Sequence, residues 1–299
     1  MLDKKPGLTS FEALGEIKRA LGSGKAGHTG TLDKFASGLL LVLAGDALKL
    51  TRWFTHCDKQ YNGRIRFGIE TDTLDPEGRE TAQAAQPARS EVEKALSQFT
   101  GEIMQEPPVF SAIHVNGRRA HELARSGKEV EMKKRPVVIH KLELLDWQPP
   151  FADIFVHCSS GTYIRSLARD IALAAGSRAH LCALTRTKIA GFSLDDAFKG
   201  SFSENCLETA DFLRPIDKTV IETLSLPLFE VQKSEAEKII HGKPLEPILE
   251  GRDACLPEGN TSAAVFCGEK LAAIVEKADG RWKYGCVMTR SFTDGAGES

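Results

Sequence analysis

The spacing of apolar and polar residues divides the first 222 residues into helices and strands in mixed order. Apolar residues at helical spacing predict helices, an unbroken apolar run predicts a buried strand, and strict alternation predicts a strand with one buried face. The main predicted elements are a helix after the capping box Thr9-x-x-Glu12, a buried strand at 39–44, an alternating strand at 60–67, a helix after Ser90-x-x-Glu93, strands near 136–146 and 152–158, and a helix from Thr162. This order shows no regular βαβ alternation and no internal repeat, so the sequence predicts an α+β fold.

The pattern changes near residue 223, where a second and smaller unit begins. A short helix is expected after Ser234-x-x-Glu237, and two apolar runs around Cys267-Gly-Glu-Lys270 predict a β-hairpin. The tail at 291–299 is small and polar, and we expect it to be disordered. The sequence therefore predicts a first domain at 1–222 and a compact, mainly β module at 223–290. The pattern alone does not show what this module does.

Composition narrows the class of protein. The 299 residues are 41% hydrophobic and 27% charged, which is typical of globular proteins. No apolar run approaches the roughly 20 residues that span a bilayer, and the start of the chain has no apolar segment of the signal-peptide kind. Seven cysteines without a Cys-x-x-Cys pair favour free thiols over a disulfide framework or a zinc site. We therefore expect a cytoplasmic protein with no membrane contact.

Charge is nearly balanced overall, at −2, but it is unevenly distributed along the chain. Residues 1–66 carry eleven Lys and Arg against six Asp and Glu, and residues 114–141 carry eight against three. Residues 67–110 instead hold nine acids against three bases. The two basic stretches fit a face that binds a polyanion, and they fit a solvated surface of mixed charge equally well.

The most informative segment for chemistry is Gly27-His-Thr-Gly-Thr-Leu-Asp-Lys-Phe-Ala-Ser-Gly38. It places one carboxylate, Asp33, in a turn-prone loop directly before the predicted buried strand, which would hold the loop rigidly. The glycines permit tight turns and a close approach of a ligand to the backbone. An ordinary solvated aspartate is the alternative. Motifs typical of NTPases, zinc proteases and serine hydrolases are absent, and Gly22-x-Gly24-x-x-Gly27 follows a helix where a dinucleotide site follows a strand.

Two further side chains occupy suggestive positions. Arg165 is predicted in the first turn of its helix, where the helix dipole disfavours a cation. A carboxylate partner would explain this position, because a bidentate Arg–Asp pair holds the aspartate ionised and oriented. A surface arginine in solvent is the alternative. Tyr61 lies on the apolar face of its strand, where it is either a core residue or a flat platform for a nucleobase.

Six blocks of the sequence resemble the bacterial tRNA pseudouridine-55 synthases. The loop at 27–38 fits their signature Gly-His-Thr-Gly-x-Leu-Asp-x-x-Ala-[Ser/Thr]-Gly. The other blocks follow in the family's order: Asp58–Tyr61, Phe67–Gly78, Gln105–Ala112, Cys158–Ser166 and Ala179–Thr187. The resemblance covers most of the first domain. It implies a mixed-sheet catalytic domain, an RNA-gripping insertion at about 110–136 and a C-terminal RNA-binding module of the PUA type.

The resemblance also implies a role for each matching residue. Asp33 corresponds to the family's catalytic aspartate, Tyr61 to the tyrosine that stacks on the target base, and Arg165 to the arginine paired with the aspartate. Three others match positions around the flipped base: Tyr163 and Leu184 in the uracil pocket, and His28 against the RNA. Plain packing is the alternative for these three.

The implied reaction isomerises uridine-55 in the T-loop of tRNA. The base is flipped out, detached from the ribose at N1 and rejoined through C5. The family requires no cofactor and no metal ion, and it holds the T-arm of tRNA mainly by backbone and shape. We expect a monomer that needs no protein partner. Two alternatives stay open: a catalytic subunit that works with guide RNA and partner proteins, and a tRNA-binding or folding factor.

The chain departs from the family pattern at a few positions. Lys34 replaces the proline that usually follows Asp33, and Lys5-Pro6-Gly7 is shifted from the common Lys-Pro-x-Gly. Three other substitutions stand at positions where the family usually has a basic or tyrosine residue: His121, Ser160 and Thr185. None of them removes a catalytic group, so they bear on RNA affinity more than on chemistry.

Overall fold

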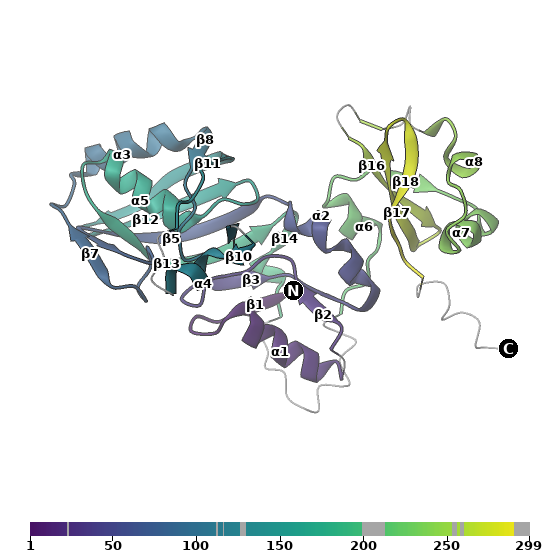
Figure 1. The fold of residues 1–299 in the computed structure, drawn as a ribbon, viewed down its shortest axis with the longest axis horizontal. Helices are drawn as coiled ribbons and strands as arrows, with labels where there is room; N and C mark the ends of the chain where they lie inside the picture. The colour runs from purple at the N-terminus through teal and green to yellow at the C-terminus, as the bar shows by residue number, and fades with distance from the viewer. Residues whose placement is uncertain are drawn as a thin grey trace.

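The computed structural model describes residues 1–22, 24–111, 113–115, 117–125, 130–198, 213–252, 256–257 and 260–289. The described elements form a large α+β domain followed by a small β-rich unit (Figure 1). No helix among these residues is long and apolar enough to cross a membrane. The predicted disorder of the tail at 291–299 lies outside the described residues.

A mixed sheet of eight strands forms the centre of the large domain. The strands are β1 (Leu2–Lys4), β3 (Ser37–Leu40), β5 (Lys59–Phe67), β8 (Gly101–Gln105), β11 (Arg135–Gln148), β12 (Phe151–Cys158), β13 (Ala179–Ile189) and β14 (Phe192–Ser193). Their order is β1-β3-β13-β5-β12-β11-β8, with β14 paired to β13. Only β3 and β13 pair in parallel, and the other neighbours are antiparallel. The predicted α+β class with a mixed sheet is confirmed.

Two helices cover one face of this sheet, α3 (Arg89–Leu96) and α5 (Ile164–Ala174). Their apolar residues share one core cluster with the inward residues of β5, β12 and β13. On β5 the buried and exposed positions alternate as predicted, with Ile65 and Phe67 in the core and Arg64 exposed. The other face of β5 carries polar side chains, and Arg64 pairs there with Asp153 of β12. Along β5 and β12 the sheet therefore has an apolar face under the helices and a polar face opposite.

The apolar run predicted as one strand at 39–44 is instead divided between two sheets. It forms the end of β3 and then β4 (Val42–Ala44), which pairs with β2 (Ala26–His28). Leu39, Leu41 and Leu43 are all buried, so hydrophobicity gives no sign of the change of partner at Leu41. Outside the segment at 110–136, the remaining described elements of this domain are α1 (Ser10–Ala20), the 3-10 helix Gly45–Leu50, α2 (Thr51–Thr55), β6 (Ile69–Thr71), β7 (Glu80–Gln83), the 3-10 helix Ser97–Phe99, the 3-10 helix Leu194–Asp196 and α6 (Lys218–Glu222).

One of three predicted capping boxes is correct. At α1, the Thr9 side chain accepts from the N–H of Glu12, whose carboxylate accepts from the N–H of Thr9. The boxes predicted at Ser90 and Ser234 are displaced, because α3 and α7 (Lys233–Ile240) each begin two residues earlier than that pattern requires. Glu91 and Glu235 cap those helices alone, each accepting the N–H of a residue without a hydroxyl.

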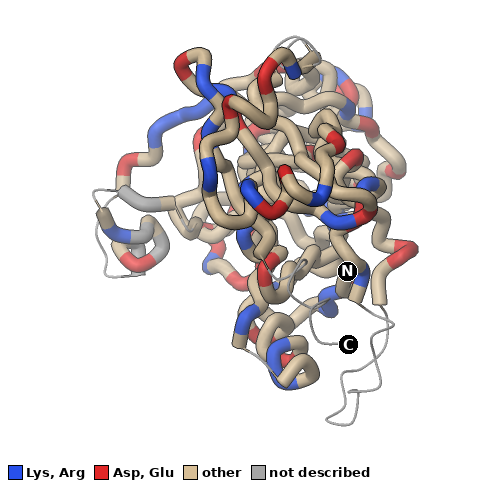
Figure 2. The backbone as a smooth tube through the Cα atoms, turned by 90° about the vertical axis from the view of Figure 1, so that its right-hand side faces the viewer, with Lys and Arg blue, Asp and Glu red and all other residues tan. Residues whose placement is uncertain are grey.

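The predicted insertion at about 110–136 contains three short described elements. These are β9 (His114–Val115), β10 (Arg118–Arg119) and α4 (Ala120–Arg125), and residues 126–129 lie outside the described residues. Three adjacent cations at 133–135 lead into β11. Elsewhere Lys and Arg are interspersed with Asp and Glu along most of the tube in Figure 2. The near-neutral net charge thus reflects mixing, with a local basic segment at the start of β11.

The described residues of the small unit form a sheet of four strands and two short helices (Figure 1). Its elements are β15 (Leu228–Glu230), α7, α8 (Glu246–Leu249), β16 (Ser262–Cys267), β17 (Lys270–Ala278) and β18 (Arg281–Val287). The hairpin predicted around 267–270 joins β16 to β17. One apolar cluster is shared by both units: Phe54 and Ile189 of the large domain pack in it with Phe266 of the small one. The two sheets therefore meet through a common core.

Candidate active site

Asp33 lies in the loop between β2 and β3, and buried polar groups fix the backbone of this loop. The Ser10 hydroxyl of α1 donates to the Leu32 carbonyl (3.0 Å) and accepts from the Leu32 N–H (2.9 Å). The Leu32 side chain is buried in the core below the sheet face that carries α5. The residue directly before Asp33 is therefore held by both its backbone and its side chain.

Arg186 of β13 supports the same loop from the opposite side. Its guanidinium is buried, and it donates to the carbonyls of Leu39 (2.8 Å) and Gly30 (3.1 Å), which flank the Asp33 segment. The close pairing of β3 with β13 requires Gly38, whose φ is +104° and where a Cβ atom would lie 2.8 Å from the Arg186 backbone nitrogen. Sequence reasoning assigned Arg186 no role, although it lies inside the last family block.

Arg165 approaches Asp33 from the first turn of α5. Its Nε lies 2.8 Å from Oδ2 of Asp33, and its Nη2 donates to Oδ1 at 3.0 Å. Only the Nη2 contact has the alignment of a hydrogen bond, so the Nε contact is an ion pair. The arginine side chain is 5% exposed and the aspartate side chain 34%. The pair is thus buried on the arginine side and open to solvent on the carboxylate side.

A second carboxylate, Asp75, binds the same guanidinium. Arg165 Nη1 lies 3.2 Å from Oδ2 of Asp75 and donates to the Thr73 carbonyl at 2.7 Å. The other oxygen of Asp75 accepts from the Glu77 N–H at 3.0 Å, which closes the turn. Leu74, directly before it, has a φ of +60°, a strained value for a non-glycine residue. No local spacing in the sequence shows that this carboxylate lies against Arg165.

The charges in this group act against one another at Asp33. Burial raises the pKa of Asp33 above its ordinary value, the positive charge of Arg165 opposes this rise, and the negative charge of Asp75 adds to it. The result is an oriented, partly buried carboxylate whose exposed edge faces solvent. Such a group can act as a nucleophile or as a general base toward a bound substrate.

Tyr61 and Leu184 lie on neighbouring strands of the central sheet. Tyr61 is on β5 opposite Arg186 of β13, and Leu184 lies opposite Gly63. Both side chains are 7% exposed and belong to the core cluster that contains Leu32. Burial raises the pKa of Tyr61 to about 12, so its hydroxyl is neutral at physiological pH. Only a small edge of either side chain is available to a ligand in this conformation.

Tyr163 lies at the N-cap of α5, one residue after the helix start predicted at Thr162. The buried Gln105 side chain accepts from the Tyr163 N–H (2.8 Å) and donates to its carbonyl (3.1 Å). The Arg135 guanidinium lies 5.0 Å from the centre of the half-buried ring. Gln105 thus fixes the backbone two residues before Arg165, a support that sequence reasoning missed.

His28 ends β2 on the other side of the Asp33 loop. Burial and the nearby charge of Arg186 lower its pKa, so the imidazole is neutral at physiological pH. Its Nδ1 is buried and has no hydrogen-bond partner among the described residues. Of the residues selected from the sequence, the described polar contacts join only Arg165 directly to the Asp33 carboxylate.

A mixed-sheet α+β domain with a loop aspartate and a buried arginine partner has the layout of a pseudouridine synthase. Residues 18–164 match the family described as "TruB family pseudouridylate synthase (N terminal domain)". The tRNA pseudouridine synthase B of Borreliella burgdorferi (strain ZS7) is 39% identical over 80% of this chain and 92% of its own length. That of Azoarcus sp. (strain BH72) is also 39% identical, over 97% of this chain and 92% of its own length. The chain therefore belongs to the TruB family of pseudouridylate synthases, which are isomerases.

The fold agrees with solved structures at lower sequence identity. A chain from the Cbf5–Nop10–Gar1 complex superposes with a TM-score of 0.66 at 24% identity, over 92% of this chain and 76% of that chain. A chain from the archaeal box H/ACA sRNP Nop10–Cbf5 complex gives 0.62 at 23% identity, over 92% and 77%. The shared fold thus extends beyond the residues of the family match into the small unit.

Proposed function

We propose that this enzyme converts uridine-55 in the T-loop of tRNA to pseudouridine, with Asp33 as its catalytic residue. The observation that carries the proposal is the Asp33 carboxylate itself, which two nitrogens of the buried Arg165 hold in one orientation while its other side is open to solvent. Relatives that share 34–41% of their residues with this chain carry the name tRNA pseudouridine synthase B.

The proposed reaction breaks the N1–C1′ bond of uridine, turns the uracil and forms the C5–C1′ bond. The proton on C5 leaves to solvent and N1 gains a proton, so the reaction is an isomerisation that consumes no co-substrate. Asp33 acts on the ribose or on the base while the glycosidic bond is broken. Arg165 keeps the carboxylate oriented and ionised against the effect of burial.

The uridine has to leave the stacked loop before Asp33 can contact it, because both reacting atoms are enclosed in folded RNA. We propose that Tyr61, Tyr163 and Leu184 form the surface that receives the base, and that His28 contacts the RNA beside it. The small exposed fraction of Tyr61 implies that the base contacts the edge of its ring, unless the site opens on binding.

The rest of the chain would bind the tRNA. We propose residues 1–222 as the catalytic domain, with the insertion at about 110–136 holding the T-arm, and residues 223–290 as an RNA-binding PUA-like domain. The cations at 133–135 support this role for the insertion. A monomer in the cytoplasm without a protein partner stays our expectation.

The test is a tritium-release assay with the purified full chain alone. An unmodified tRNA transcript labelled at C5 of uridine should release one equivalent of tritium, and the same transcript with cytidine at position 55 should release none. Release that requires added guide RNA would contradict the stand-alone enzyme.

The second candidate is a catalytic subunit that works with guide RNA and partner proteins. It is favoured by the fold shared with chains of complexes titled Cbf5–Nop10–Gar1 and H/ACA RNP. Identity to those chains is 22–24%, which shows the fold alone, whereas the tRNA synthase relatives are 34–41% identical. A tRNA-binding or folding role is compatible with either enzyme.

A further inference from the structure

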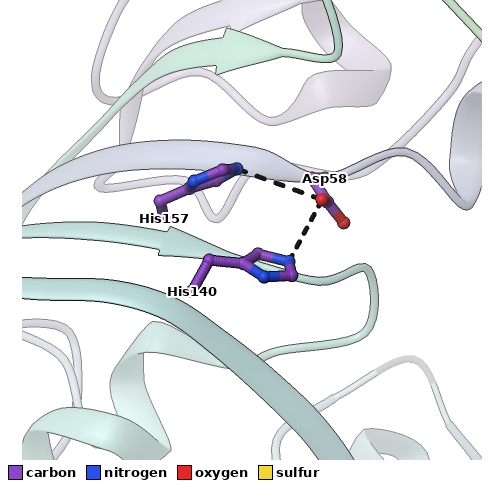
Figure 3. A group of neighbouring side chains, drawn as sticks. All are labelled: Asp58, His140 and His157. Carbon is purple, nitrogen blue, oxygen red and sulfur yellow. Dashed lines mark ion pairs between the residues drawn. The ribbon is translucent and has the colours of Figure 1, made fainter. Parts of the chain in front are cut away.

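Three side chains with metal-binding atoms meet on the polar face of the central sheet. They are Asp58, His140 and His157, shown in Figure 3. Nε2 of His140 lies 3.1 Å from Oδ2 of Asp58, and Nε2 of His157 lies 4.0 Å from the same oxygen. One ligand atom from each residue lies within 4.8 Å of the others. The two imidazole rings are 4.7 Å apart between centres.

The sheet brings these residues together although they are far apart in sequence. Asp58 directly precedes β5, His157 lies on β12 opposite Gln60, and His140 lies on β11. β11 has a bulge at His140, because Ile139 pairs with Cys158 and Lys141 already pairs with His157. The extra residue turns outward beside His157. The sequence predicted no metal site, and no spacing along the chain indicates this group.

The group is separate from the Asp33 site. Val156 and Cys158, the neighbours of His157 on β12, both point into the core on the side of α5. Because side chains alternate along a strand, His157 points to the opposite face. The sheet therefore stands between this group and the Asp33–Arg165 pair.

The donor set suits one kind of ion. Two imidazoles and a carboxylate bind zinc and other first-row divalent metals, whereas magnesium and calcium favour oxygen ligands. Tetrahedral zinc with bonds of roughly 2.0–2.1 Å keeps its ligand atoms about 3.3 Å apart. The Asp58–His140 distance is already close to this value, and a small rotation of the His157 side chain would bring it within range. The side chains are 33–47% exposed, so they are free to make this adjustment.

We propose that Asp58, His140 and His157 form a binding site for one divalent transition-metal ion of the zinc class. The protein supplies three ligands and solvent completes the coordination. A bound ion would join the start of β5 to β11 and β12, three residues before Tyr61. Its role would be to fix these strands rather than to take part in the isomerisation.

The test uses the full chain stripped of metal with a chelator and titrated with cobalt(II), which reports its ligands through visible absorption. Wild type should bind one equivalent with the spectrum of nitrogen and oxygen ligands, and added zinc should displace it. His140→Asn and His157→Asn should each weaken binding by at least about tenfold. The control is His56→Asn, which removes an exposed histidine whose Nδ1 contacts the Arg52 carbonyl. It should bind as wild type does.

A second measurement covers the case in which a variant folds poorly. Zinc should raise the melting temperature of wild type and of His56→Asn, and should not raise that of the His140→Asn/His157→Asn double variant. Three results would each overturn the proposal: no stoichiometric binding to wild type, unchanged binding in the double variant, or a cobalt-thiolate charge-transfer band showing that cysteines hold the ion. If wild type shows no stoichiometric binding, Asp58 and His140 form a simple Asp–His pair.

Discussion

The two faces of the central sheet carry two groups of charged side chains built in opposite ways. On the helix-covered face, Asp33 pairs with an arginine that is 5% exposed and always charged. On the polar face, Asp58 faces two histidines that are 33–37% exposed and that carry no permanent charge. In both groups a side-chain nitrogen lies within about hydrogen-bonding distance of an aspartate oxygen. The two groups differ in how deeply the nitrogen-bearing side chain is buried and in whether its charge is permanent.

The difference lies mainly in what holds each group in place. Ser10 and Arg186 fix the backbone around Asp33, while Asp75 and the Thr73 carbonyl fix its arginine partner. The histidines on the other face depend on strand register and one bulge. A preformed geometry suits a catalyst, because the group need not reorganise during the reaction. A looser, titratable group suits an ion that completes the geometry itself.

The largest expected effect is on turnover, and it distinguishes the Asp33 group from the group around Asp58. Asp33→Asn should lower turnover at least about 10³-fold, because the amide is neither a nucleophile nor a base. Tritium release measures turnover, and filter binding should show that tRNA affinity is largely retained. His157→Asn, on the other face, is the matched control and should stay within about twofold of wild type. Equal losses in both variants would end the distinction between the faces.

The next effect concerns the buried arginine. Arg165→Met leaves the carboxylates of Asp33 and Asp75 without their shared cation, and should cost about 3–4 kcal/mol of unfolding free energy in urea. The figure is in the lower part of the range for buried pairs because Asp33 reaches solvent. Adding Asp33→Asn should restore part of the loss. If Arg165→Met is as stable as wild type, the pair is not a structural part of the site.

A smaller effect tests the support of the Asp33 loop. Gly38→Ala should cost about 2–3 kcal/mol, because its φ is +104° and its new Cβ would press on the Arg186 backbone. Gly7→Ala is the control for backbone strain alone, since its φ is +86° and its surroundings are open, and it should cost about 1 kcal/mol. Chemical denaturation compares them. Equal costs would mean that the close contact with β13 does not matter.

The smallest effect is on the pH dependence of kcat/KM, and it appears only at acidic pH. The folded pKa of Asp33 is raised above 3.8, so the working carboxylate is present above the raised value and is lost as pH falls through it. The acid limb of kcat/KM should therefore lie above 3.8. Between pH 3.8 and the raised pKa of Asp33, the free energy of unfolding falls slightly as pH rises, because the folded state keeps a proton that the unfolded state has already released. A limb at or below 3.8 would show that the Arg165 charge outweighs burial.

Much of the large domain could be predicted from the sequence because its signals are local. The alternation along β5 and the capping box at Thr9 each depend on neighbouring residues, and the structure confirms them. The first-turn position of Arg165 also followed from periodicity, and the structure places the side chain against Asp33.

What escaped prediction depends on contacts between distant segments. The strand at 39–44 is divided at Leu41 by the choice of partner strands, which an unbroken apolar run cannot reveal. Asp75 reaches Arg165 through a turn with a strained Leu74. His140 meets His157 because a bulge shifts the register by one residue. In each case the deciding quantity is pairing or backbone conformation rather than residue type.

The apolar cluster shared by Phe54, Ile189 and Phe266 has a consequence for substrate choice. Because the two sheets meet through one core, the distance from the small sheet to Asp33 is set within the protein. An RNA bound to both regions would present to Asp33 the uridine at one fixed separation from the segment on the small sheet. One uridine among many would then be selected by its distance from the RNA segment on the small sheet, and the enzyme would not have to recognise the neighbouring bases.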